Sequence, residues 1–386
     1  MSPFSAIFVP DELAEALSDR AWLDAMLAAE RALVDAQAQA GLVPADAAAA
    51  VAEALRSELY DVTALAVEGQ APGNPVEPLV RAIRARLGEE HAEQVHRGAT
   101  SQDILDTAAM LVARGALQFV DRELESAADA CARLAERHRH TVMAARTLLQ
   151  QAVPTTFGYK AASWLVGLVD ARGRLAALDL PAQLGGAAGT LAALGGDGGE
   201  VLRLYAAELD LREPVVPWHT QRAPLARLAG ALSEAAVAVA KIAHDVVLLA
   251  QTEVGEIAEG DGGASSTMPH KRNPVQAVLA DACARHARAN AALLVESGVH
   301  EHERAAGAWH AEWAALNRTL AGAGGAAAAI GRSLGGLQVD VQRMRSNISP
   351  DTLSEAARFG IDAEGPEDYL GSANEFIDRA LALHGA

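Results

Sequence analysis

Residues 225–249 read LARLAGALSEAAVAVAKIAHDVVLL, and this stretch decides the fold. Its apolar side chains recur three and four residues apart over more than three heptads, at Leu225, Leu228, Leu232, Ala235, Val239, Ile242, Val246 and Leu249. That spacing places them on one face of a long helix, which is the pattern of a helix packed in a bundle. The stripe therefore predicts the core of a helical bundle, formed at this length between subunits.

The composition also favours helices. Of 386 residues, 51% are hydrophobic and only 4% are aromatic, with alanine and leucine dominating the apolar part. Alanine and leucine stabilise helices, and the scarcity of β-branched and aromatic runs argues against extensive sheet. The length allows a large core and more than one domain.

The charge and the cysteines restrict the partners and the compartment. A net charge of −18 disfavours nucleic acid and anionic membranes as partners. There is no uninterrupted apolar run of about 18 residues, so no membrane span is expected, and the first residues lack the features of a signal peptide. Cys131 and Cys283 are expected to be buried thiols, which suits a cytoplasmic protein.

Residues 260–274, GDGGASSTMPHKRNP, predict a mobile loop that ends at a helix start. The glycines give backbone freedom, Ser265 and Ser266 supply hydroxyls, and Lys271 supplies positive charge. Asn273 followed by Pro274 suits the N-cap and first position of a helix. Such a loop fits an active-site lid; a solvated surface turn is the alternative.

Residues 96–107, HRGATSQDILDT, predict a helix start with an anion site. Thr100 and Asp103 have capping-box spacing, and the helix is expected to run to about His138, over about 50 Å. Thr100, Ser101 and the free backbone N–H groups there suit an anion. His96 precedes them, with an ordinary pKa suited to proton transfer near neutral pH. A satisfied helix cap beside a surface histidine is the alternative.

Other polar residues leave their roles open. Asn74, in a Gly-Asn-Pro-Val turn, is expected to cap the next helix. Gln150 and Gln151, in the run RTLLQQAVPTTFG, either hydrogen-bond a carboxylate or cap neighbouring helix ends. The histidines and glutamates of residues 300–303 do not have the H-E-x-x-H spacing, so we expect no metal there.

Several of these strings resemble motifs of the fumarase/aspartase superfamily. SSTMPHKRNP at 265–274 matches its signature loop S-S-x-M-P-x-K-x-N-P, and residues 96–107 are similar to its H-x-G-x-T-S-x-D-I-x-D-T motif. HERAAGAWHAEW at 302–313 resembles the branch of 3-carboxy-cis,cis-muconate cycloisomerases, and Leu148 stands where adenylosuccinate lyases have a histidine. The chain departs from the family at Ala264, usually glycine, and in a short C-terminal region that implies an internal deletion.

The resemblance implies an all-α fold with a long central helix bundle. The expected parts are an N-terminal helical domain at 1–95, the bundle at 96–330 and a reduced C-terminal segment at 331–386. It further implies a homotetramer with shared active sites. Each site would combine residues 96–103, 146–151 and 260–273 from different chains.

The function implied is conversion of 3-carboxy-cis,cis-muconate to carboxymuconolactone in protocatechuate degradation, the β-ketoadipate pathway. Ser265 would transfer the proton, Lys271 would assist it, and His96 would orient the substrate or share proton transfer. The residues expected to contact this small polycarboxylate are Asn74, Thr100, Ser101, Gln102, Gln150, Gln151, Ser266, Met268, Asn273 and Arg304. No metal or organic cofactor is needed, because no electrons are transferred.

Two alternatives remain at this stage. One is another lyase of the superfamily that eliminates from a substituted succinate, adenylosuccinate-like or nitrosuccinate-like. The other is a catalytically silent helical oligomer that acts as a scaffold.

Overall fold

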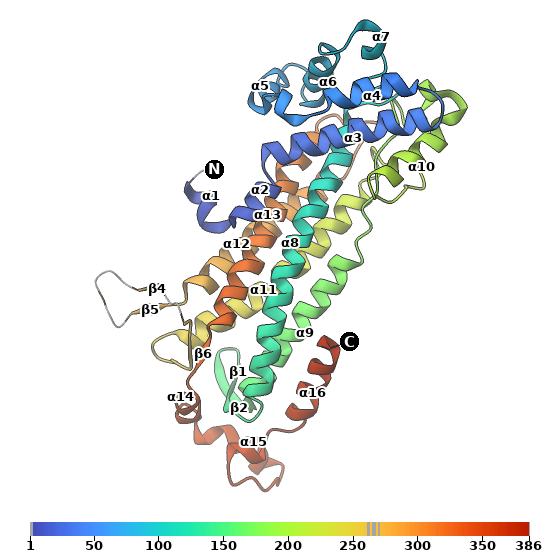
Figure 1. Ribbon diagram of the computed structural model, residues 1–386. Helices are drawn as coiled ribbons and strands as arrows, with labels where there is room; N and C mark the ends of the chain where they lie inside the picture. The colour runs from blue at the N-terminus through green and yellow to red at the C-terminus, as the bar shows by residue number, and fades with distance from the viewer. Residues whose placement is uncertain (1–2, 261–262, 265–267, 269–270, 386) are drawn as a thin grey trace.

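The long helices run side by side through an elongated molecule (Figure 1). The structure is a computed structural model that describes residues 3–260, 263–264, 268 and 271–385. The bundle helices are α8 (Ser101–Arg137), α9 (Phe157–Ala176), α11 (Ala223–Ala250), α12 (Val275–Glu296) and α13 (Ala308–Gly335). The predicted all-α class with a long central bundle is therefore confirmed.

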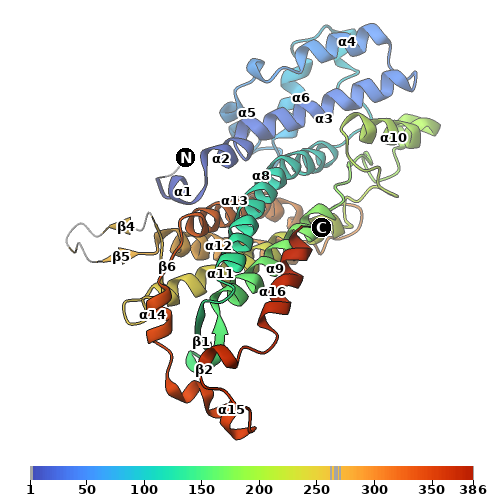
Figure 2. The same ribbon diagram turned by 60° about the horizontal axis from the view of Figure 1, so that its bottom comes forward.

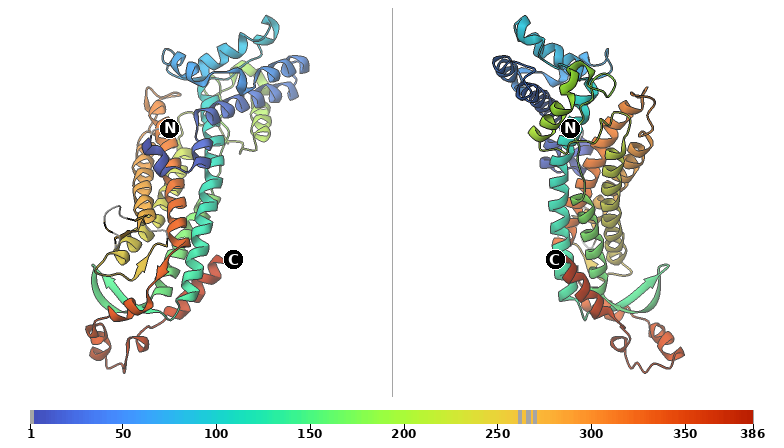
Figure 3. Two further views of the ribbon diagram at one scale, coloured as in Figure 1. Left: turned by 60° about the vertical axis from the view of Figure 1, so that its left-hand side comes forward. Right: turned by 90° about the vertical axis from the view of Figure 1, so that its right-hand side faces the viewer.

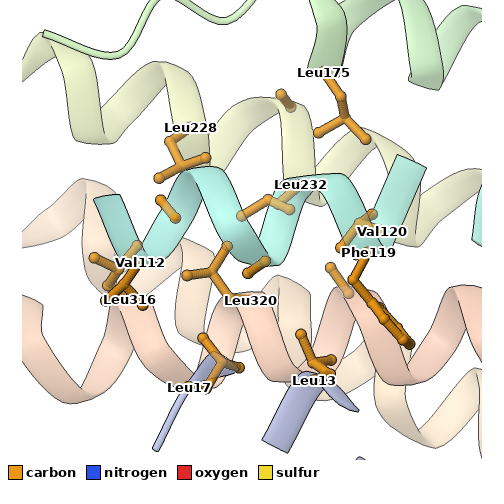
Figure 4. Close-up of a cluster of buried hydrophobic side chains, with 14 of the residues drawn as sticks. Leu13, Leu17, Val112, Phe119, Val120, Leu175, Leu228, Leu232, Leu316 and Leu320 are labelled. Atoms are coloured by element: carbon orange, nitrogen blue, oxygen red, sulfur yellow. The ribbon is translucent and has the colours of Figure 1, made fainter. Parts of the chain in front are cut away.

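The apolar stripe of α11 lies in the bundle core. Leu228, Leu232 and Val246 are fully buried, and the other stripe positions are also buried. Figure 4 shows Leu228 and Leu232 of α11 near Val112 and Val120 of α8. The 3-4 spacing thus predicted correctly which face of this helix is buried.

A further group of helices forms one end of the molecule, around the N-terminus of α8 (Figures 1 and 2). They are α3 (Asp19–Gln39), α4 (Ala45–Ala54), η1 (Ser57–Leu59), α5 (Val62–Glu68), α6 (Val76–Arg84), α7 (Glu89–Ala92), η2 (Ala192–Asp197) and α10 (Gly198–Glu208). Helices α1 (Pro3–Phe8) and α2 (Asp11–Ala16) lie farther along the bundle, where α1 packs on α13 and α2 packs on α8 and α13. Helix α3 packs on both α8 and α10. This end therefore surrounds the predicted anion site.

The opposite end holds a β-hairpin and the C-terminal elements (Figure 3). Strands β1 (Val142–Thr147) and β2 (Gln150–Thr156) pair antiparallel. The chain ends with α14 (Val341–Ser346), η3 (Pro350–Leu353), α15 (Ser354–Arg358), η4 (Pro366–Asp368) and α16 (Ala373–His384). Helix α16 returns to pack against α9 and α8.

Two minor sheets flank the predicted loop. Strand β3 (Ile257–Ala258) pairs with β6 (Gln338–Val339), and β4 (Gly263–Ala264) pairs with β5 (Arg272–Asn273). Helix α12 begins at Val275, so the N-cap expected at Asn273 is wrong: Asn273 lies in β5 and its amide donates to the carbonyl of Gly263 at 3.3 Å. Among the described residues, no helix is both long and apolar enough to cross a membrane.

The expected domain boundaries fall at different kinds of position. The boundary at 95/96 lies in the short connection before α8, whereas the boundary at 330/331 falls inside α13. The division of the chain into three domains, at 1–95, 96–330 and 331–386, stays a prediction.

Candidate active site

The N-terminus of α8 has the structure that its sequence predicts. Thr100 occupies the N-cap, and its backbone N–H donates to the carboxylate of Asp103 at 2.9 Å. Ser101 begins the helix and both residues are partly exposed. The helix dipole and free N–H groups at such an end favour an anion.

His96 is held beside this helix end by a buried acid. Its Nδ1 lies 2.6 Å from Oε1 of Glu30, on α3, and the two side chains are 14% and 2% exposed. Burial alone would lower the pKa of His96, but the charge and hydrogen bond of Glu30, with Asp103, raise that pKa above its ordinary value. His96 also has a φ of 61°, uncommon for a residue other than glycine, so the backbone is constrained here.

Arg304 lies against the same helix end. Its guanidinium donates to Oε1 of Gln102 at 3.3 Å, to the carbonyl of Ala187 at 2.9 Å and to that of Gly186 at 3.3 Å. The side chain of Gln102 is fully buried, and its hydrogen bonds, including the one from Arg304, are made inside the protein. The structure therefore brings a cation from residue 304 to the first turn of α8, as the carboxylate-binding hypothesis requires.

Asn74 is used as a local cap. Its Oδ1 accepts hydrogen bonds from the backbone N–H groups of Val76 and Glu77, both at 3.1 Å, at the start of α6. The neighbouring Gly73 has a φ of 73°, and a Cβ there would lie 3.7 Å from Nε2 of His310 on α13. The turn thus lies at the same end of the bundle, while contact of Asn74 with a substrate stays a prediction.

The second predicted segment lies at the opposite end of α8, on the β-hairpin. Gln151 donates to the carbonyl of Asn347 at 2.7 Å and accepts from the N–H of Ser349 at 2.9 Å, so it joins the hairpin to the end of α14. This is the helix-capping alternative for Gln151. Gln150 is exposed beside the hairpin turn.

The third segment is the signature loop. Ser265 and Ser266 lie outside the described residues. Met268 and Lys271 are exposed, and the backbone N–H of Lys271 donates to the carbonyl of Met268 at 2.9 Å. Arg146 of the hairpin pairs with the fully buried Glu256, which precedes this loop, at 2.5 Å.

One chain does not bring the three segments together. Helix α8 has 37 residues and so separates its N-terminal end from the hairpin by about 55 Å at 1.5 Å per residue. In Figure 1 the hairpin and the N-terminus of α8 lie at opposite ends, and β4 and β5 project to one side. Within a single chain, His96 and Arg304 thus lie together at the N-terminal end of α8, but the three predicted segments do not meet.

Sequence reasoning missed a buried ionic cluster beside the α8 end. Arg222 donates to Asp106 at 2.7 and 3.0 Å and to Glu312 at 2.9 and 2.6 Å. Burial would lower the pKa of Arg222, but the two carboxylates raise that pKa above its ordinary value. The two carboxylates lie 116 and 90 residues from Arg222 in the sequence, so no local pattern signals the cluster. The cluster joins α8, α11 and α13 at the candidate site.

In the part of the chain that the structure describes, no group of three or more His, Cys, Asp or Glu side chains is arranged to hold a metal ion.

Comparison with known proteins places the chain in a family. The model of the lyase family matches residues 9–288. Nitrosuccinate lyase of Streptomyces davaonensis is 49% identical over 349 residues, which cover 86% of this chain and 74% of that protein. The 3-carboxy-cis,cis-muconate cycloisomerase of Bradyrhizobium diazoefficiens is 46% identical over 358 residues, covering 90% and 79%.

A solved structure extends the match to the whole fold. The 3-carboxy-cis,cis-muconate lactonizing enzyme of Pseudomonas putida superposes with a TM-score of 0.93 at 35% identity, over 100% of this chain and 99% of that one. The motifs, the bundle and these matches agree, and the chain belongs to the lyase family of the fumarase/aspartase superfamily.

Proposed function

We propose that this protein is a 3-carboxy-cis,cis-muconate cycloisomerase that forms carboxymuconolactone. The observation that carries the proposal is the convergence of Arg304 on the N-terminal turn of α8, beside Thr100 and Ser101. A guanidinium and a helix N-terminus are both suited to carboxylates. The 302–313 string and the 46% identical cycloisomerase support the same substrate class.

The proposed reaction is an intramolecular addition. One substrate carboxylate oxygen forms a C–O bond to an alkene carbon, and the π electrons move to the neighbouring carbon and its carboxylate. A proton then forms the new C–H bond at that carbon. Arg304 and the α8 N–H groups stabilise the charge that accumulates on the carboxylate. Ser265 is the proposed proton donor, with His96 and Lys271 as further candidates for proton transfer.

Elimination of nitrous acid from nitrosuccinate is the second candidate. It is favoured by the 49% identity to a nitrosuccinate lyase. Its chemistry uses the same features, because charge again develops on a carboxylate next to the reacting carbon. A site that binds and polarises a carboxylate therefore suits both reactions, and only the substrate distinguishes them.

The proposal includes a homotetramer in the cytoplasm. Exposed apolar residues on the outer faces of α11 and α12, namely Val237, Leu248, Val278, Leu293 and Val295, support further helix packing between chains. The wide separation of the three segments supports sites shared between chains. Two buried free thiols, Cys131 and Cys283, suit a reducing compartment.

The test is a direct comparison of the two substrates. Lactonisation removes the conjugated diene of 3-carboxy-cis,cis-muconate, so its ultraviolet absorbance falls. Elimination from nitrosuccinate releases nitrite, which is measured by colour. We expect rapid loss of diene absorbance and slower nitrite release. The reverse ranking would assign the second candidate, and turnover of neither would contradict both.

Two variants connect the activity to the site. Ser265→Ala is expected to lower kcat by about 10²–10⁴-fold, the usual contribution of a general acid or base, without changing the oligomeric state. Arg304→Ala is expected to raise KM and lower kcat. Retained turnover in Ser265→Ala would contradict the assignment of the proton donor.

A further inference from the structure

The position of Arg304 depends on a turn at residues 185–187. Two of its three hydrogen bonds go to backbone carbonyls of this turn, at Gly186 and Ala187. The turn is attached in its own right to α8: the N–H groups of Gly185 and Gly186 donate to the carboxylate of Asp103 at 2.8 and 2.9 Å. Asp103 also accepts from the N–H of Thr100. One carboxylate thus holds both the helix end and the support of Arg304.

His219 completes this arrangement from a fourth segment, just before α11. Its Nε2 lies 2.6 Å from Oδ1 of Asp103, and the two residues are 4% and 0% exposed. Since a carboxylate accepts at that position, Nε2 carries the hydrogen. The carbonyl of His219 also accepts from Gln102 at 2.8 Å, and Gln102 binds Arg304 through its other amide atom. His219 therefore reaches Arg304 by two routes.

The turn has little room to shift. A Cβ at Gly185 would lie 2.8 Å from Cε1 of His219, closer than such contacts normally are. Gly186 has a φ of 68°, and a Cβ there would lie 2.7 Å from the carbonyl oxygen of Gly98. The hydrogen bonds and the close packing together fix the carbonyl groups that bind Arg304.

We propose that His219, acting through Asp103, is a positioning residue that sets Arg304 against the N-terminus of α8 and so determines affinity for a polycarboxylate. The inference rests on the proposed function, because it takes Arg304 as a carboxylate contact. It adds a residue whose effect on the substrate is indirect: the side chain of His219 is buried and its partner is Asp103.

A matched pair of variants isolates the bond from His219 to Asp103. The amide nitrogen of Gln extends about as far as Nε2, so His219→Gln retains the donor. His219→Asn is one methylene shorter and cannot reach Asp103. Binding of tricarballylate, a saturated tricarboxylate, to the full-length protein is measured by calorimetry, so that no turnover is needed. We expect His219→Asn to weaken binding by about tenfold, corresponding to one lost interaction, and His219→Gln to bind as the wild type does.

A double-mutant cycle then distinguishes positioning from general damage. If His219 acts through Arg304, the tenfold effect of His219→Asn largely disappears in an Arg304→Ala background, because coupled sites are not additive. Arg379→Ala, a matched arginine change on the exposed surface of α16, is the control background, in which the effect of His219→Asn is expected to persist in full. If His219→Asn does not fold, Thr107→Val replaces it, since the Thr107 hydroxyl holds Gln183, two residues before the turn, at 2.9 and 3.0 Å.

Each outcome decides the question. Loss in His219→Asn, retention in His219→Gln and coupling to Arg304 support the proposal. If Arg304→Ala weakens binding but His219→Asn acts equally in both backgrounds, the proposal is overturned and the proposed function stands. If the wild type does not bind tricarballylate, or Arg304→Ala leaves its affinity unchanged, Arg304 is not a carboxylate contact. The proposal then falls with that assignment, while the diene assay still decides the reaction.

Discussion

At the residue scale, the contact of His96 with Glu30 connects the candidate site to stability. The pKa of His96 is raised in the folded protein, where the buried Glu30 stabilises the protonated ring. A raised folded pKa contributes stability that is complete below the ordinary value of about 6.5 and is lost as the pH rises through the folded value. Protonated His96 is therefore a stabilising partner of Glu30, and this is the charge state that its proposed role in proton transfer uses.

Removing this histidine should remove that pH dependence. His96→Asn is the suitable change, because Asn tolerates the positive φ. We expect the wild-type advantage in free energy of unfolding to be about 1.5–3 kcal/mol below pH 6, the value of a hydrogen bond to a charged group, and to shrink at alkaline pH. Urea unfolding from pH 5.5 to 9 measures it. His384→Asn is the control, since its partner Asp129 is 50% exposed and such surface pairs contribute little. Parallel pH curves for wild type and His96→Asn would contradict this account.

At the element scale, the two ends of the signature loop are joined by an acid that sequence reasoning passed over. Glu259, which precedes the loop, is 5% exposed and accepts from the N–H groups of Gln276 and Ala277, at 3.0 and 2.8 Å, in the first turn of α12. It satisfies the helix end that Asn273 was expected to cap. A negative charge at a helix N-terminus is also favourable.

Neutralising Glu259 should destabilise the protein. Glu259→Gln is expected to cost about 1–3 kcal/mol, because an amide NH₂ would face backbone N–H groups that need an acceptor. Glu296→Gln, the same change at the exposed C-terminal end of α12, should stay within about 0.5 kcal/mol. Chemical denaturation of both variants checks this. An equal effect of the two changes would show that Glu259 does not clamp the loop.

Local patterns in the sequence predicted the helices better than the hairpin. The capping box at Thr100 and the apolar stripe of α11 can each be recognised from a short stretch of sequence, because the residues that form them are three or four positions apart. The β1–β2 hairpin was missed because its turn is formed by Leu148 and Leu149, with φ of 50° and 64°. Such turns normally use Asn or Gly, which adopt positive φ with little strain. No turn signal was therefore present.

At the scale of the whole molecule, the motifs identified the candidate site residues but not the buried residues that hold them in place. Asp103 and His219 are 116 residues apart and Asp106 and Trp309 are 203 apart, yet both pairs are hydrogen-bonded. Contacts between residues so far apart in the sequence depend on tertiary packing, so no periodic pattern in the sequence predicts them. Functional roles could be predicted for the motif residues because the motifs resemble those of the superfamily.

The proposed active site combines segments of different chains. Helix α8 keeps the Arg304 end away from the other two segments within a chain, so the proposal requires Ser265 of one chain to meet Arg304 of another. Two variants test this, Ser265→Ala and Arg304→Ala, each of which disables the site from one side. In hybrid oligomers some sites receive both wild-type residues, whereas neither pure variant has any.

The deciding measurement is the rate of diene loss from 3-carboxy-cis,cis-muconate after Ser265→Ala and Arg304→Ala chains are mixed, unfolded and refolded together. Native mass spectrometry confirms that hybrids form. Refolding each variant alone gives the baseline. A rate well above both baselines is the predicted result. Hybrids that form but turn over no faster than the pure variants would contradict a shared active site.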